Sequence, residues 1–204
     1  MQQLADRVNT FVRHVPVWAI YLLCLMPVPW LFYLGVSGGL GVDPVKTLEQ
    51  ELGEIALQLL IIGLCITPLR RFLNVNFLRF RRAIGVLAFV YVCLHLLVWA
   101  LLDVQSFDRV MADILKRPYI TIGMASLVLL LPLAATSNNW SVRFLGPKWR
   151  QLHKLTYLAA LLGGLHYLWL AKGFQLLPLA YLAVILILLG LRLKLPRRVK
   201  VGSA

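Results

Sequence analysis

The sequence predicts an all-α integral membrane protein, a six-helix transmembrane bundle with both termini cytoplasmic. Two observations lead to this fold class. Of the 204 residues, 60% are hydrophobic and only 14% are charged, with a mean hydropathy of +0.80, whereas a soluble domain of this size needs far more polar surface. Apolar runs close to the roughly 20 residues that span a bilayer also recur along most of the chain.

The six expected helices follow these apolar runs in order. Pro27 and Pro29 are expected to bend the first helix, and Pro68 with the arginine pair after it ends the second. Gly146-Pro147 marks the loop before the fifth helix. The expected spans are approximately residues 15–36, 53–69, 83–102, 119–136, 152–170 and 176–193. They form one membrane domain over residues 1–204, so any soluble catalytic domain belongs to a partner.

The formal net charge of +13 is unevenly distributed. Orientation follows the bias of lysine and arginine, so the basic side of the bundle is expected to be cytoplasmic. The same distribution argues against nucleic acid as a partner and leaves membrane lipid. Sixteen of the 21 basic residues fall on that side: Arg7, Arg13, Arg70, Arg71, Arg79, Arg81, Arg82, Arg143, Lys148, Arg150, Lys154, Arg192, Lys194, Arg197, Arg198 and Lys200. Seven of the eight acids lie on the other side or at its edge: Asp43, Glu49, Glu51, Glu54, Asp103, Asp108 and Asp113.

Two histidines lie deep inside expected helices, His95 in the third and His166 in the fifth. An ionisable side chain within hydrocarbon is costly and usually faces the bundle interior with a partner. Each lies roughly 20 Å along its helix from the cytoplasmic end, so the two are level in the outer half of the membrane. Haem iron takes two axial imidazoles, and bundles often build such sites from facing helices. We therefore expect His95 and His166 to ligate a b-type haem.

Small residues accompany both histidines. Ala88 and Ala159 each stand seven positions before a histidine, and Gly163 lies one turn before His166. They would let a flat macrocycle approach, although they equally allow ordinary helix packing. Three other interpretations of the pair stay open: structural histidines bonded to carbonyls or hydroxyls, another metal, and a proton relay. Another metal is less favoured because no carboxylate or cysteine is expected at matching depth, and a relay because the spans lack a chain of acids.

His153 stands at the cytoplasmic entrance of the fifth helix, 13 residues before His166. That separation, about 20 Å along a helix, suits a second haem, but it puts the two side chains on different faces. The position 13 residues before His95 is Arg82, which cannot ligate iron. His153 is therefore a candidate either for a second haem or for contact with a propionate, a flavin or a lipid headgroup. Arg82 is a candidate for contact with a propionate or phosphate.

Several motifs spaced over nearly the whole chain resemble one family. They are Gly39–Lys46, Ile66–Arg71, Arg81–Gly85 leading to Leu94–Leu96, Lys116–Tyr119, Trp149–Tyr157 and His166–Trp169. In this order they resemble MsrQ (formerly YedZ), the haem-binding membrane subunit of bacterial periplasmic methionine sulfoxide reductase systems, within the wider ferric reductase-like transmembrane group. The resemblance implies a multi-pass protein of the bacterial inner (cytoplasmic) membrane.

The resemblance also implies a function. It is that of a b-type cytochrome that passes electrons from the quinone pool or a cytoplasmic flavin reductase to the periplasmic molybdopterin enzyme MsrP. That partner reduces methionine sulfoxide in oxidised periplasmic proteins, so catalysis resides in the partner. The wider group typically holds two haems on two histidines from each of two helices, and Arg82 departs from that pattern. FMN is implied by the resemblance alone, and no residue is assigned to it.

Two other classes of function stay open. A stand-alone transmembrane reductase would hold a similar cofactor and reduce ferric iron or oxygen without a partner. A haem-free membrane scaffold or transporter would be colourless; transporters often show interrupted helices in repeated halves, and the sequence displays no convincing repeat. The acidic outer stretches Asp43–Glu54 and Asp103–Asp113 are candidates for docking a partner, because weak encounters of complementary charge suit electron transfer.

Overall fold

The computed structural model describes residues 2–171 and 175–192, and this part of the chain contains helices and no strand. Four stretches are long and apolar enough to cross a membrane: Val17–Ser37, Pro44–Leu73, Leu78–Val104 and Pro118–Ala135. Two later helices are shorter, α10 (Leu155–Leu170) with 16 residues and α11 (Leu176–Gly190) with 15. The prediction of an all-helical membrane protein is confirmed. The count of six spans, the cytoplasmic position of both termini and the single domain stay predictions.

Part of the charge bias lies outside the described residues, namely Lys172 and the basic residues from position 194 onward. The expected end of the sixth helix at residue 193 lies there too.

The first expected helix is divided into α2 (Val17–Leu25) and α3 (Pro27–Ser37), which meet at Met26. Met26 keeps helical dihedrals, φ −53° and ψ −38°, and Val17–Ser37 form one stretch long enough to cross a membrane. Proline has no N–H to donate, so the helical hydrogen bonding is interrupted at Pro27 within this stretch.

The second span, α4 (Pro44–Leu73), begins nine residues before the expected start at residue 53. A side-chain oxygen of Asp43 accepts from the N–H of Lys46 at 3.1 Å, and Pro44 occupies the first helical position. An aspartate cap followed by proline is a strong helix start. The expected start was wrong because hydropathy falls in this acidic stretch while the helix continues. α4 ends at Asn74, whose φ of +55° is left-handed.

The third span changes its helical geometry near its C-terminal end. The short η1 (Leu78–Phe80) leads into α5 (Arg81–Val98), and Trp99–Val104 continue as a π-helical segment, η2. The N–H of Gln105 donates to the carbonyl of Ala100 at 3.0 Å, and a φ of +58° at Gln105 closes the segment. π-helical turns are rare and often lie at functional sites. This one begins four residues after His95.

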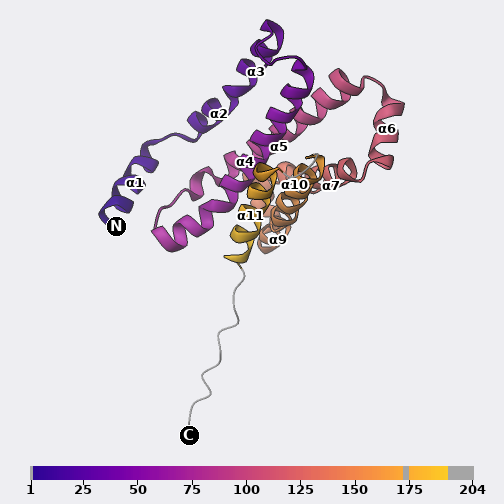
Figure 1. The fold of residues 1–204 in the computed structure, drawn as a ribbon. Coiled ribbons are helices and arrows are strands. Elements are labelled where there is room, and N and C mark those ends of the chain that lie inside the picture. Colours follow the sequence, from indigo (N-terminus) through magenta and orange to yellow (C-terminus); the bar gives the residue numbers. More distant parts are fainter. Residues whose placement is uncertain (1, 172–174, 193–204) are drawn as a thin grey trace.

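Two helix pairs form the centre of the molecule (Figure 1). α4 packs along α5, α7 (Pro118–Ala135) packs along α10, and α11 covers α10 and α4. Ala88 on α5 and Ala159 on α10 are fully buried, so neighbouring helices approach closely there. Tyr91 of α5 is also fully buried, and its hydroxyl donates to the carbonyl of Cys24 at 2.5 Å. This bond ties the first span to the central pairs.

Four short helices outside the expected spans complete the described structure: α1 (Gln2–His14), α6 (Phe107–Lys116), α8 (Asn139–Leu145) and α9 (Pro147–Leu152). α1 is attached to the end of α4, because Asn9 donates to the carbonyl of Asn74 at 3.0 Å and accepts from the N–H of Asn76 at 2.8 Å. The expected fifth helix, 152–170, is interrupted at its start: α9 ends at Leu152, and α10 begins only at Leu155.

Candidate functional site

His95 is held by a backbone group of the neighbouring helix. Its Nδ1 lies 2.8 Å from the carbonyl oxygen of Glu49 on α4. A carbonyl can only accept, so Nδ1 carries the proton and Nε2 is left with a free lone pair. One turn beyond Glu49, Gly53 lies against the ring, and a β-carbon there would be 2.9 Å from Nδ1 of His95. The imidazole therefore rests on the bare backbone of α4 in a fixed tautomer.

His166 is held in the same way by the other helix pair. Its Nδ1 lies 2.7 Å from the carbonyl oxygen of Tyr119 on α7, which fixes the same tautomer. A β-carbon added to Gly123, one turn beyond Tyr119, would lie 2.9 Å from Nδ1 of His166. The pair α7 and α10 thus repeats the arrangement in the pair α4 and α5. In each pair, one helix provides a carbonyl and, four residues later, a glycine, and both contact a histidine on the other helix. Hydropathy does not reveal this repeat, because it consists of backbone contacts.

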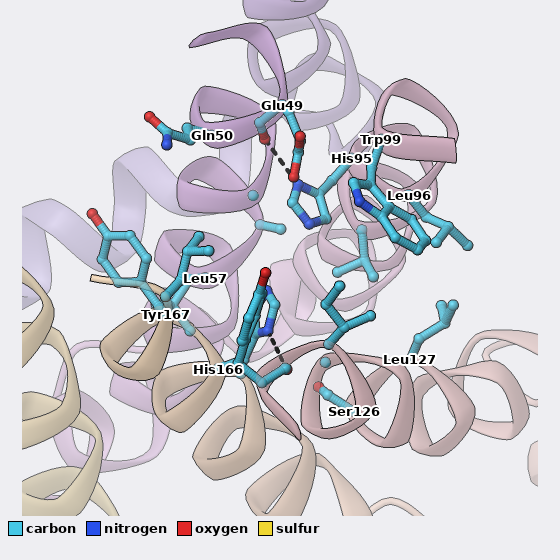
Figure 2. Close-up of a pocket in the computed structure, with 18 of the residues that line it drawn as sticks. Glu49, Gln50, Leu57, His95, Leu96, Trp99, Ser126, Leu127, His166 and Tyr167 are labelled. Atoms are coloured by element: carbon cyan, nitrogen blue, oxygen red, sulfur yellow. Dashed lines mark hydrogen bonds between the residues drawn. The ribbon is translucent and has the colours of Figure 1, made fainter. Parts of the chain in front are cut away.

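The two imidazoles face each other across a cavity (Figure 2). Their ring centroids are 6.2 Å apart and their planes are inclined by 77°. Two imidazoles that bind one metal ion from opposite sides, at roughly 2.0–2.1 Å each, have their centroids about 6.4 Å apart. Because each Nδ1 bonds outward to a carbonyl, each Nε2 is on the ring edge turned inward. The structure therefore brings together the two predicted ligands at a spacing that fits one iron.

The cavity around them has a volume of about 310 Å³, within the roughly 300–1,000 Å³ usual for small-molecule and cofactor sites. Its inner walls are apolar, with Leu57, Leu60 and Leu127 among the lining residues. Its charged lining groups are Lys46, Glu49, Glu54, Asp103 and Arg117. A pocket with apolar walls and several charged lining groups suits a flat amphipathic ligand that has an apolar body and a polar edge.

A carboxylate that the sequence analysis placed at the edge of the membrane lies beside this site. Glu54 follows Gly53 on α4 and accepts hydrogen bonds from the hydroxyls of Tyr181, at 2.9 Å, and Tyr167, at 3.2 Å, and from Nε2 of Gln58, at 3.2 Å. The expectation that no carboxylate sits level with the histidines was therefore wrong, because α4 starts earlier than expected. Among the described residues, however, no three His, Cys, Asp or Glu side chains gather as a metal cluster.

A second cavity of about 230 Å³ lies toward the other end of the same helices and is lined by both Arg82 and His153. His153 lies between α9 and α10, stacked on Trp149 with ring centroids 3.9 Å apart. Its Nε2 is 3.1 Å from the hydroxyl of Thr136, and that hydroxyl lies 2.6 Å from the carbonyl of Pro132. Since Thr136 donates to this carbonyl, Nε2 of His153 donates to Thr136.

The electrostatics of the second cavity are cationic. Nη1 of Arg82 donates to Oδ1 of Asn139 at 2.7 Å. Burial, and then the charges of Arg81 and Arg82, lower the pKa of His153, which lies outside the transmembrane helices, so the neutral ring is favoured. The structure thus places both candidate residues at one site and gives each a protein partner. It does not bring His153 to the pair formed by His95 and His166.

Comparisons with known proteins identify the family of the chain. Residues 52–164 match the family model described as ferric reductase like transmembrane component. Three similar proteins carry the name protein-methionine-sulfoxide reductase heme-binding subunit MsrQ. One, from Agrobacterium fabrum, is 48% identical over 88% of this chain and 84% of its own length. Those from Brucella anthropi and Brucella ovis are 47% and 46% identical over 88% of this chain and 82% of theirs.

No solved structure matches the chain. The family match covers α5 and α7 completely, α4 from residue 52 onward and α10 up to residue 164, and all four helices line the first cavity. The matched range contains His95, Gly53 and Gly123, and it ends two residues before His166. The chain belongs to the ferric reductase like transmembrane family and, within it, to the MsrQ subunits.

Proposed function

We propose that this chain is a b-type cytochrome of the bacterial inner membrane, with His95 and His166 as the axial ligands of one haem. The observation that carries the proposal is the pair of imidazoles that face each other 6.2 Å apart. Each is oriented by its own backbone carbonyl. The names of its relatives, heme-binding subunits of a protein-methionine-sulfoxide reductase, support both the cofactor and the biological system.

The chain contributes orientation and basicity to the ligands. The bonds from Nδ1 of His95 to Glu49 and from Nδ1 of His166 to Tyr119 fix both rings with Nε2 free. A hydrogen bond from the second ring nitrogen raises the basicity of a metal-bound imidazole. Gly53 and Gly123 allow the rings to lie against the backbone, which limits their rotation. The two ligands are therefore preorganised before any metal is present.

When bound, a haem supplies one-electron redox chemistry at its iron, and the protein tunes and positions it. The apolar side chains of Leu57, Leu60 and Leu127 exclude water from the inner part of the cavity. The charged groups at the rim remain at the surface, where a partner protein can approach. This division lets the chain hold an electron carrier in the membrane while presenting one edge of the site to an acceptor.

The acceptor that we propose is the periplasmic molybdopterin-dependent methionine sulfoxide reductase, MsrP, which would use the electrons to repair oxidised periplasmic proteins. The donor is the quinone pool or a cytoplasmic flavin reductase. Asp103 and Asp108, in the outer connection between α5 and α7, belong to the acidic stretch that we propose for docking the acceptor. Transfer of electrons between proteins suits such weak charged encounters. FMN remains a cofactor proposed from the family, without a residue assigned to it.

We propose one haem per chain, in the first cavity. In the second cavity the imidazole of His153 is bonded to Thr136 and the guanidinium of Arg82 to Asn139. Arg82 cannot ligate iron, and one histidine there has no second histidine opposite it. The basic groups of this cavity suit contact with a phosphate or carboxylate at the point where electrons enter.

The test is the reduced-minus-oxidised visible spectrum of the purified protein and of its histidine variants. We expect a b-type spectrum that is lost in His95→Ala and in His166→Ala and retained in His153→Ala. The exposed His14, which bonds only to the carbonyl of Thr10 within the described structure, offers a matched control as His14→Ala. A wild type that stays colourless when expressed with haem available would overturn the proposal and favour a haem-free scaffold or transporter.

A second measurement separates the partnered function from a stand-alone reductase. The dithionite-reduced protein is mixed anaerobically with purified oxidised MsrP, and separately with a ferric chelate or oxygen. Reoxidation by MsrP that is much faster than reoxidation by the chelate supports the proposed electron-transfer role. Rapid turnover with the chelate or with oxygen, and none with MsrP, would assign the chain to the stand-alone class.

A further inference from the structure

Trp99 is a buried side chain of the first cavity that ligation of iron does not use. It is 8% exposed, begins η2 four residues after His95, and lines the same cavity as His95. Figure 2 shows its indole beside His95 at the cavity, with the nitrogen on the edge that faces His95.

The indole nitrogen of Trp99 forms no hydrogen bond within residues 2–171 and 175–192. Tryptophan has one polar hydrogen and no acceptor, so this N–H needs an acceptor oxygen. Among the described residues, the buried side-chain nitrogen without a partner is Nε of Arg192, so the indole nitrogen of Trp99 is not enclosed by protein and can be reached from the cavity that it lines. The lining of the cavity therefore includes a donor aimed at a ligand, at the point where α5 gives way to the π-helical segment Trp99–Val104.

The charges around Trp99 identify which part of a ligand it meets. Two cations line the cavity at its outer rim: Lys46 lies in the first turn of α4, and Arg117 directly precedes α7. Three acids, Glu49, Glu54 and Asp103, line the cavity as well, so the two cations do not make its charged lining basic. Among the described residues Arg117 forms the one ion pair, with Asp113 at 3.2 Å. A neutral donor such as Trp99 stabilises an anionic oxygen regardless of this balance.

We propose that the haem of this site lies with its carboxylate edge toward the outer rim of the cavity, and that the indole N–H of Trp99 donates to one propionate. This inference rests on the proposed function, because it concerns the same cavity. In the opposite direction the walls are Leu57, Leu60 and Leu127, and the hydroxyl of Ser126 already donates to the carbonyl of Ala159. Trp99 is thus a positioning residue, which sets the rotation of the macrocycle about the axis joining His95 and His166.

The experiment compares the full-length haem-loaded protein with Trp99→Phe, which keeps an aromatic ring and removes the N–H. Trp169→Phe is the matched control, since Trp169 is 60% exposed and does not line the cavity. We expect Trp99→Phe to keep a six-coordinate low-spin spectrum, to shift the propionate bending band in resonance Raman spectra, and to have a lower midpoint potential. A propionate that loses a donor carries more negative charge, which favours ferric iron. Transfer of haem to apomyoglobin should be roughly ten-fold faster.

A second comparison needs no variant and remains informative if Trp99→Phe fails to accumulate. Haem-depleted wild-type protein is loaded with haem or with haem dimethyl ester, in which both carboxylates are esterified. We expect the ester to be released roughly ten-fold faster or more, and the difference to shrink in Trp99→Phe. Equal release of haem and its ester by the wild type, or a Raman spectrum of Trp99→Phe unchanged from wild type, would overturn the inference. Failure of the wild type to bind haem at all would instead overturn the proposed function.

Discussion

Gly53 lies against the imidazole of His95 so closely that a β-carbon on it would be 2.9 Å from Nδ1. Gly123 stands in the same relation to His166. These glycines are needed for the space that they leave, since neither has a left-handed backbone conformation. The position of each iron-ligand candidate is thus decided by a neighbouring helix as much as by its own.

We predict that Gly53→Ala and Gly123→Ala each displace one imidazole and convert the bis-histidine spectrum to a five-coordinate or haem-depleted one. The added methyl meets the stiff ring of a histidine, which is also tied to a backbone carbonyl, so the ring has to move. Gly190→Ala is the control, because a β-carbon there has nothing within 4 Å, and alanine favours a helix by about 1 kcal/mol over glycine. Wild-type spectra in both cavity variants would contradict the packing described.

Glu54→Ala should destabilise the bundle by about 1–2 kcal/mol. The substitution removes the acceptor that joins Tyr167 of α10 and Tyr181 of α11 to α4, and interhelical hydrogen bonds in membranes contribute roughly 0.6 kcal/mol each on average. Denaturant-induced unfolding in detergent micelles measures the change in free energy. The exposed Glu51 on the same helix provides the control Glu51→Ala. Equal stability of the two variants would show that the Glu54 cluster does not hold the helices together.

As the pH falls below about 6.5, the free energy of unfolding should decrease, in part because of His153. Its folded-state pKa is lowered by burial and by Arg81 and Arg82, so the native state binds fewer protons than the unfolded state. The corresponding stability is present above the unfolded-state pKa and is lost as pH falls through the folded-state pKa. Thermal unfolding followed from pH 7.5 to pH 5 should show a shallower decline in His153→Gln than in wild type. Parallel curves would contradict this role of His153.

Asp43→Ala should weaken the start of α4 by about 1 kcal/mol and loosen His95. Asp43 caps the helix whose second turn supplies the Glu49 carbonyl to His95. We expect faster amide exchange in the first turns of α4 and broader low-spin signals in the electron paramagnetic resonance spectrum of the haem-loaded protein. Asp43→Asn keeps a capping oxygen and should restore both properties. If Asp43→Asn changes both properties as much as Asp43→Ala does, the negative charge of Asp43, and not its capping oxygen, supports the start of α4.

The number of haems per chain shows whether one cavity or both bind haem. With one haem per chain we expect an iron-to-protein ratio near one and no change in Arg82→Gln or His153→Ala. A ratio near two in the wild type, falling to one in His153→Ala, would assign a second haem to the cavity that both residues line. The matched comparison is His166→Ala, which should remove the iron of the first cavity in either case.

The sequence by itself determined the membrane class and the two histidines at similar depth. Both depend on signals that a linear chain carries: long apolar runs, and the cost of an ionisable group within them. The distance of about 20 Å from the expected cytoplasmic end, counted along each helix, already predicted that His95 and His166 are level. The motifs that resemble MsrQ led to the family that the comparisons then showed.

The tertiary structure decided what surrounds those histidines. Because α4 begins at Pro44, Glu54 lies in the third turn of the helix and accepts hydrogen bonds from Tyr167 and Tyr181. Hydropathy missed this early start because acidic residues lower the hydropathy even inside a helix. The carbonyls of Glu49 and Tyr119, and the glycines one turn after each, are invisible in sequence because a backbone group has no signature. The burial of Trp99 likewise depends on which helices pack against α5. Periodicity and hydropathy report each helix alone, whereas the site is made of contacts between helices, and only packing determines those.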